Sequence, residues 1–261
     1  MDGDVVRLRR DERGVATLTM NRPAARNAFD EALVAQLTAA GEALTADEAV
    51  RVVVLTGSGG AFSAGADLAW MRSMGDCSHD DNVADARRLD RMLRVLYDLP
   101  KPLVGRVNGA ALGGGAGLVA VCDAAVAADD ALFGFTEVRL GLAPAVVAPY
   151  VVRKVGRSFA RWAFVTGERV DARRALAAGL VHQVVRPDEL DGAVEATVAS
   201  CLRAGPEAVA CAKRLPDLAL AGLDEAADRM AELLAGLRAG PEGQEGMTAF
   251  LERRAPSWAP E

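Results

Sequence analysis

Histidine and cysteine are scarce in this chain. It has two histidines, His79 and His182, and four cysteines, no two of which form a Cys-x-x-Cys pair. Zinc sites and disulfide frameworks normally require closely spaced clusters of these residues. The sequence therefore predicts neither a metal site nor disulfides, and we expect the thiols to be reduced.

Positive net charge and long apolar runs are also missing. The formal net charge is −6, so no general basic surface is available to neutralise a phosphate backbone. The N-terminus is charged where a secretory signal needs an apolar core, and no apolar run reaches the roughly 20 residues that span a bilayer. We expect a cytoplasmic protein that binds neither nucleic acid nor membrane.

The residues that are present suit one large globular domain, or one domain with an appendage, of mixed architecture. Of 261 residues, 51% are hydrophobic and 25% are charged, which is typical of a globular protein. The order strand, loop, helix, strand occurs at least twice, which predicts an α/β fold. The expected elements are a hairpin of strands 5–9 and 15–20, a helix at 31–44 capped by Asp30, a strand at 51–56, a helix at 83–99, a strand at 103–107, a helix at 118–122 and a strand at 124–127.

The last hundred residues read as helices. Gly179 and Gly205 follow predicted helix ends, where we expect left-handed backbone. Most of these helices carry an apolar stripe on one side only, which requires a partner surface. The predicted helices are 158–166, 172–178, 193–204, 206–215, 223–237 and 242–252.

Two glycine-rich loops, 57–67 and 108–117, follow the two core strands. Neither fits a nucleotide motif: a dinucleotide fingerprint starting at Gly113 would need glycine where Leu118 stands, and Gly60 to Gly65 has P-loop spacing but lacks the following Lys-Ser or Lys-Thr. A serine hydrolase elbow at Ser63 is also disfavoured, because the elbow should follow its strand at once and five residues separate Thr56 from Phe62.

A different use of glycine remains, namely a backbone that a ligand can approach. Amides of residues 113–115 at a helix N-terminus, together with amides of the loop 61–68, could bind one oxygen as an oxyanion hole. Close packing of a helix on a sheet is the alternative explanation for a single such loop. Two loops after two core strands favour a functional site.

At this point the sequence resembles the enoyl-CoA hydratase/isomerase, or crotonase, superfamily. The motifs that carry the resemblance cover nearly the whole chain in order. They are NRPAARNAF (21–29), GGAFSAGADL (59–68), KPLVGRVNGAALGGGAGLVAVCD (101–123), FGFTEVRLGLAP (133–144), GERVDARRALAAGLVHQVV (167–185) and FLERRAPSW (250–258).

The resemblance implies a spiral of ββα units over residues 1–195, which would hold the acyl-CoA site, and a helical trimerisation region over 196–261. It implies an acyl-CoA substrate and a homotrimer or hexamer. Coenzyme A would be part of the substrate, so no separate cofactor and no metal are expected.

Carried over residue by residue, the two oxyanion-hole amides fall on Ala66 and Gly114, in agreement with the loop argument. The catalytic carboxylate falls on Glu137, whose apolar neighbours should raise its pKa by desolvation. Substrate-binding positions implied for the acyl-CoA path are Ala24, Arg26, Ala64, Asp67, Gly113 and Gly117. Arg26, Lys101, Arg253 and Arg254 are candidate phosphate partners, although each could equally be a solvated cation. Asp67 and Asp123 are expected to cap or orient loops.

The sequence departs from the two-glutamate hydratases at Gly117, where their water-activating glutamate would stand. One carboxylate suffices to move a proton from C2 to C4, which favours a Δ3,Δ2-enoyl-CoA isomerase. The segment 136–156 instead looks like hydratases of branched or carboxylated enoyl-CoAs, such as the methylglutaconyl-CoA group. We favour a hydratase, with the isomerase as alternative and a non-catalytic CoA-binding scaffold as a third possibility.

Overall fold

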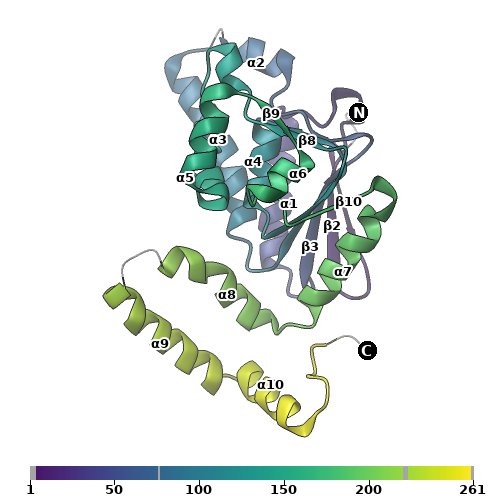
Figure 1. Ribbon diagram of the computed structural model, residues 1–261, viewed down its shortest axis with the longest axis vertical. Helices are drawn as coiled ribbons and strands as arrows, with labels where there is room; N and C mark the ends of the chain where they lie inside the picture. The colour runs from purple at the N-terminus through teal and green to yellow at the C-terminus, as the bar shows by residue number, and fades with distance from the viewer. Residues whose placement is uncertain (1–3, 76, 220–222, 260–261) are drawn as a thin grey trace.

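Two β-sheets form the centre of the computed structural model, which describes residues 4–75, 77–219 and 223–259. The larger sheet has the strand order β1-β2-β3-β5-β7-β10, and the smaller has the order β4-β6-β8-β9. Helices cover both sheets, and a group of C-terminal helices extends away from them (Figure 1). The α/β prediction is therefore confirmed.

The chain enters the larger sheet through the predicted hairpin. Strands β1 (Val6–Arg10) and β2 (Val15–Met20) pair antiparallel, and β2 then pairs parallel with β3 (Val52–Gly57). The turn between β1 and β2 contains Gly14 at φ 80°, where an added Cβ would lie 2.5 Å from the Ala49 carbonyl oxygen. Glycine is required here both by conformation and by space.

Three successive turns of the spiral each add one strand to each sheet. In the larger sheet these are β3, β5 (Leu103–Val107) and β7 (Ala124–Ala128); in the smaller sheet they are β4 (Ala61–Ser63), β6 (Ala110–Leu112) and β8 (Leu132–Gly134). All of these neighbours pair parallel. The predicted spiral of ββα units is confirmed. The sequence did not reveal the three-residue strands, because they are too short to show a hydrophobic period.

The helices lie close to their predicted positions. The largest differences are in α4, which starts at the glycines themselves, and in α5, which begins ten residues earlier than expected and has a break at Gly156 (φ 74°). Helix α2 is not among the ranges predicted above. The helices are α1 (Glu31–Ala46), α2 (Leu68–Gly75), α3 (His79–Tyr97), α4 (Gly114–Val121), α5 (Ala148–Thr166), α6 (Ala172–Ala177), α7 (Leu190–Leu202), α8 (Pro206–Ala219), α9 (Leu223–Ala239) and α10 (Pro241–Glu252). The remaining elements are strands β9 (Arg169–Asp171) and β10 (Gln183–Val185) and the 3-10 turns η1 (Pro23–Ala25), η2 (Glu137–Leu140) and η3 (Pro187–Glu189).

Strand β3 is buried on both faces and divides the core in two. Because successive side chains of a strand point to opposite faces, Val53 and Leu55 join the main core with α1, α3 and α4, while Val52 and Val54 pack with α7. The continuous apolar run Val52–Leu55 follows from this double burial.

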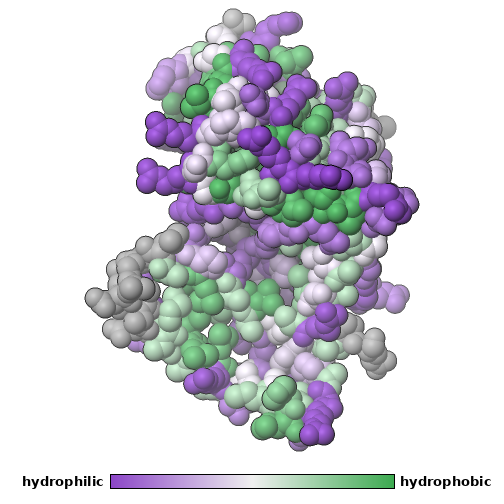
Figure 2. Space-filling model, viewed as in Figure 1, coloured by the Kyte–Doolittle hydropathy of each residue, from purple (hydrophilic) through white to green (hydrophobic). Residues whose placement is uncertain are grey.

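Helices α8 to α10 form a lobe apart from the sheets (Figure 1), and hydrophobic residues are exposed over this lobe (Figure 2). Phe250 is 83% exposed and Leu251 is 80% exposed. Helix α7, which crosses the predicted domain boundary at 195/196, packs on the larger sheet through Val194 and Val198. The division into two domains and the role of the lobe in assembly stay predictions.

The two glycines predicted to end helices behave differently. Gly179 has the expected positive φ, 79°. The expectation for Gly205 was wrong, because its φ is not positive; a Cβ there would lie 2.3 Å from Oε1 of Glu242. The Glu242 carboxylate accepts hydrogen bonds of 2.8 Å from the amides of Glu207 and Ala208. Gly205 thus makes room for the carboxylate that caps α8.

Across the described ranges, none of the helices has both the length and the apolar character that crossing a bilayer requires.

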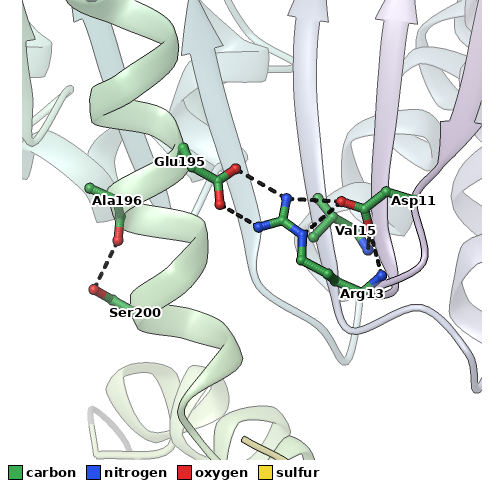
Figure 3. A network of polar contacts seen from close by, with 6 residues as sticks. All are labelled: Asp11, Arg13, Val15, Glu195, Ala196 and Ser200. Atoms are coloured by element: carbon green, nitrogen blue, oxygen red, sulfur yellow. Dashed lines mark hydrogen bonds and ion pairs between the residues drawn. The ribbon is translucent and has the colours of Figure 1, made fainter. Parts of the chain in front are cut away.

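A surface network ties the β1–β2 turn to α7 (Figure 3). The Arg13 guanidinium forms a two-pronged ion pair with Glu195 and also donates a 2.9 Å hydrogen bond to Asp11. Both partners of the long-range pair are well exposed, 42% for the Arg13 side chain and 52% for that of Glu195. Water screens such pairs strongly, so the apolar contacts of α7 should matter more.

Replacing Arg13 with alanine should therefore lower the free energy of unfolding by less than about 1 kcal/mol. The Val198→Ala substitution removes two buried methyl groups and should cost about 2 kcal/mol. Urea denaturation of both variants measures the difference. A larger loss for Arg13→Ala than for Val198→Ala would contradict this order.

Candidate active site

The parallel pairing of β4 with β6 brings the two glycine loops together. In this pair Ala61 lies opposite Ala110 and Ser63 opposite Ala111, so the loops leave the same edge of the sheet. A Cβ on Gly65 would lie 2.7 Å from the Leu112 carbonyl oxygen and 3.6 Å from Cα of Gly113. Both glycines have positive φ, 85° and 51°. The loops touch backbone to backbone, which only glycine permits.

The Ala66 amide is left free by the way its loop is held. Ala66 forms a parallel bridge with Phe29. In this bridge the Phe29 amide donates to the Gly65 carbonyl (2.6 Å) and the Asp67 amide donates to the Phe29 carbonyl (2.8 Å). Both bonds flank Ala66, whose own N–H consequently faces away from Phe29. Ala66 is exposed, and its amide makes no hydrogen bond to any described residue.

The Gly114 amide is free for a different reason: it begins α4. The first amides of a helix have no partner within it and lie at the positive end of its dipole. The preceding Gly113 amide is taken by the Gly134 carbonyl at 2.8 Å, whereas no hydrogen bond to a described residue uses that of Gly114.

Glu137 lies beside these loops on η2, which follows β8. Its Oε1 would be 3.2 Å from a Cβ on Gly113. Its Oε2 is buried and has no hydrogen-bond partner within the described part of the chain. Burial raises the pKa of this carboxyl, and a hydrogen bond from its own amide offsets only part of the effect. A carboxyl with a raised pKa and a free oxygen is suited to accepting and donating protons.

The residues predicted for the acyl-CoA path adjoin the same loop. Arg26 has left-handed backbone (φ 51°), and its carbonyl accepts a 2.9 Å hydrogen bond from the Ala64 amide. Ala24 is exposed on η1, just before this turn. The side chain of Arg26 is exposed and pairs with no described residue. The structure thus brings Ala24, Arg26 and Ala64 together at the loop that carries Ala66.

Asp67 and Asp123 orient loops, as the sequence suggested. Asp67 accepts a 2.9 Å hydrogen bond from the Ala69 amide at the start of α2 and pairs with Arg22 at 3.1 Å. Burial opposes, but does not cancel, the lowering of the Asp67 pKa by these two partners. Asp123 accepts from the Leu103 amide at 2.7 Å. Both carboxylates are occupied by the protein itself.

Gly117 lies in the buried part of α4 and has no room for a side chain. A Cβ there would lie 2.3 Å from Cγ1 and 2.9 Å from Cβ of Val147, and Val147 is only 3% exposed. A glutamate could enter position 117 only if Val147 were displaced. The site therefore contains Glu137 without a second carboxylate at this position.

Three cations considered as phosphate partners are engaged elsewhere or lie in the C-terminal lobe. The Lys101 ammonium donates to the carbonyls of Leu44 and Asp47 at the end of α1, and Arg254 pairs with Glu245 at 2.7 Å. Arg253 ends α10 with left-handed backbone (φ 57°). Lys101 is thus better explained as a helix cap than as a phosphate ligand.

The serine hydrolase alternative is wrong. Ser63 is fully buried and donates its hydroxyl hydrogen to the Asn27 carbonyl at 2.8 Å. His182 accepts from the Ala125 amide at 3.0 Å, and the side chain of His79 is 89% exposed. No cluster of metal-binding side chains occurs among the residues that the structure describes.

Sequence reasoning missed the residues that support the loops. Asn27 is fully buried with φ 55°, and its side-chain amide donates to the carbonyls of Ser58 and Ala61. Phe29 contacts both glycine loops. Only the position of these residues within the motif 21–29 hinted at them, since their partners lie far away in sequence.

Solved structures match this arrangement over almost the whole chain. The Pseudomonas aeruginosa protein AtuE superimposes with a TM-score of 0.94 at 39% identity, covering 98% of this chain and all of that one. An enoyl-CoA hydratase from Mycobacterium smegmatis gives 0.92 at 40% identity, with 97% and 98% covered. Two glycine loops and a buried carboxyl on this spiral define an α/β protein of the crotonase fold.

The family model "Enoyl-CoA hydratase/isomerase" matches residues 10–261. The 2,3-dehydroadipyl-CoA hydratase of Escherichia coli is 36% identical over 247 residues, 94% of each chain. The crotonyl-CoA hydratase of Syntrophomonas wolfei is 34% identical over 250 residues, 93% of this chain and 94% of its own. This chain belongs to the enoyl-CoA hydratase/isomerase family.

The packing at Gly117 predicts how a side chain there would act. Gly117→Ala places a methyl against Val147 and should lower the free energy of unfolding by about 1–3 kcal/mol. Combining it with Val147→Ala removes the clashing methyl groups, so the double variant should be more stable than the sum of the single changes predicts. Thermal or urea unfolding of all four proteins measures this coupling, and strict additivity would contradict it.

Proposed function

We propose that this protein is an enoyl-CoA hydratase that adds water across the C2=C3 bond of a 2-enoyl-CoA thioester. Family membership and the names of its relatives support the hydratase activity. The observation that carries the proposal at the site is the half-buried Glu137 side chain: its Oε1 lies beside Gly113, and its buried Oε2 has no partner among the described residues. This group is available for proton transfer next to two free amides.

In this proposal the amides of Ala66 and Gly114 bind the thioester oxygen. Attack at C3 sends the π electrons of the C2=C3 bond through C1 to that oxygen, which gains negative charge. Preorganised N–H donors stabilise this charge without reorganisation, and one such donor is typically worth about 3 kcal/mol in the transition state. The start of α4 adds a favourable helix dipole.

Glu137 then serves as the single acid and base. Its carboxylate accepts a proton from water while the water oxygen bonds to C3, and the resulting acid delivers that proton to C2 of the enolate. The carboxylate is thereby regenerated, and one water has been added. A pKa raised by burial brings the two protonation states closer in energy, as both half-steps require.

The Δ3,Δ2-enoyl-CoA isomerase remains the second candidate, favoured by one observation. Val147 fills the space beside Gly117, so no second carboxylate can activate water from that position. Moving a proton from C2 to C4 needs only Glu137 and the two amides.

Binding and assembly follow the same family pattern in our proposal. Coenzyme A arrives as part of the substrate and runs past Ala24, Arg26, Ala64 and Gly113, and no separate cofactor takes part. Helices α8 to α10 would join the chain into a homotrimer or hexamer, which the exposed Phe250 and Leu251 support. A cytoplasmic location stays a prediction from the sequence.

The decisive assay offers the protein 2-enoyl-CoAs and 3-enoyl-CoAs with straight, branched or carboxylated acyl chains. We expect hydration of 2-enoyl-CoA, seen as loss of the conjugated thioester absorbance and formation of 3-hydroxyacyl-CoA. Glu137→Gln keeps the shape of the side chain and removes the base, so kcat should fall about 10²–10⁴-fold while acyl-CoA still binds in calorimetry.

Glu189→Gln is the matched control, because Glu189 is an exposed residue of η3 that pairs with Arg186. Its turnover should equal that of the unchanged protein. Undiminished turnover in Glu137→Gln would remove Glu137 from the mechanism. Migration of the double bond without hydration would select the isomerase, and binding with no conversion of any substrate would select the scaffold.

The raised pKa of Glu137 also predicts the pH dependence of the reaction. The first half-step requires the carboxylate, so kcat/KM should rise with pH through the pKa of Glu137. Because burial raises that pKa, the acidic limb should lie above pH 4.5, the ordinary value for glutamate. Rates measured in constant ionic strength buffers, with circular dichroism as a check on folding, locate the limb. An acidic limb at or below the ordinary value would contradict the assignment.

A further inference from the structure

We propose that Phe29 is a positioning residue that sets the separation between the Ala66 and Gly114 amides. The inference rests on the proposed function, since it assigns those amides to the thioester oxygen. Phe29 would touch neither substrate nor reacting atoms. It acts through its contacts with both loops at once, by its backbone with one and by its ring with the other.

The backbone of Phe29 holds the loop that carries Ala66. Its amide donates to Gly65 at 2.6 Å, and its carbonyl accepts from Asp67 at 2.8 Å. These two bonds enclose Ala66 and fix the plane of its peptide. Any shift of Phe29 therefore moves the Ala66 amide with it.

The ring of Phe29 supports the start of α4. A Cβ built on Gly114 would lie 2.5 Å from Cε2 and 3.0 Å from Cδ2 of the ring. The ring edge thus lies directly against the backbone of Gly114, and the side chain is only 1% exposed. Protein interiors are close-packed, so the size of this ring determines how near α4 can approach.

The segment that carries Phe29 is itself held rigidly. Arg22 pairs with Asp30 at 2.9 Å and with Asp67 at 3.1 Å, joining the segment to the Ala66 loop. Asn27 anchors the other end through hydrogen bonds of 2.9 Å and 2.8 Å to the carbonyls of Ser58 and Ala61. Phe29 therefore has fixed supports on both sides, and its ring spans the distance from one amide-bearing loop to the other.

The test replaces the Phe29 ring with a smaller side chain. Phe29→Leu should let the start of α4 move, so that the two amides no longer bind one oxygen together. We expect kcat to fall about 10- to 10³-fold, because misplacing a donor by about 1 Å or losing it has effects of this size. The KM should change less than kcat, since Phe29→Leu keeps the backbone hydrogen bonds that hold the Arg26 and Ala64 side of the coenzyme A path.

A spectroscopic readout separates positioning from general loss of structure. The thioester C=O stretch of bound butyryl-CoA moves to lower frequency when both amides polarise it. This shift should be smaller in Phe29→Leu than in the unchanged protein. The measurement needs no turnover, so it tests Phe29 even if the chain hydrates none of the enoyl-CoAs offered.

Leu44→Ala is the control, because Leu44 is a buried residue of the same core at the far end of α1. It should lose thermal stability while keeping kcat and the C=O shift. If Phe29→Leu does not fold, Phe29→Met is measured in the same way. Methionine is unbranched and flexible, so it can fill more of the space that the ring leaves.

A rescue variant gives an independent check. Gly114→Ala alone should collide with the ring and lower kcat, whereas in Phe29→Leu/Gly114→Ala the new methyl fills the space that the ring leaves. The double variant should recover at least part of the kcat lost in Phe29→Leu. Unchanged kcat and C=O shift in a folded Phe29→Leu or Phe29→Met protein would overturn the inference, as would the absence of any rescue.

Discussion

The contact between Gly65 and Gly113 is the constraint on which the rest of the site depends. Two loops from separate turns of the spiral meet there main chain to main chain, with positive φ at both residues. The parallel β4–β6 pair sets the direction of this meeting, and the absence of side chains sets its closeness. Either loop alone would serve only to let a helix pack closely on a sheet. Together they present two amides with no partner among the described residues, beside a carboxyl whose Oε2 atom lacks one as well.

The polar groups of this site are costly for the folded protein. An unpartnered carboxyl oxygen inside the chain loses its water without gaining a hydrogen bond, and free amides at the start of a helix forgo capping. The surrounding structure compensates with a dense apolar core on one side of the larger sheet and α7 on the other. Asp67 and Asn27 next to the loops are hydrogen-bonded. Among the described residues, the buried side-chain oxygens without a partner are Oε2 of Glu137 and Oγ of Ser58.

Much of this could be predicted from the sequence, for reasons that differ by element. The β-branched run at 51–56 and the glycines after it specify a buried strand and an open loop locally, and the motifs supplied Ala66, Gly114 and Glu137 as candidates. The short strands β4, β6 and β8 carry too few residues to show a period. The left-handed backbone expected for Gly205 was wrong because its partner, Glu242, is distant in sequence. The contact of Lys101 with the end of α1 is equally distant and could not be predicted. Phe29 escaped notice for the same reason.

The packing of Val147 on Gly117 also bears on how such a protein can change over generations. A carboxylate introduced at position 117 alone meets a filled space and must displace Val147. A smaller residue at position 147 introduced first would instead leave a cavity beside Gly117. The order of two such replacements therefore decides whether the intermediate protein is strained or underpacked.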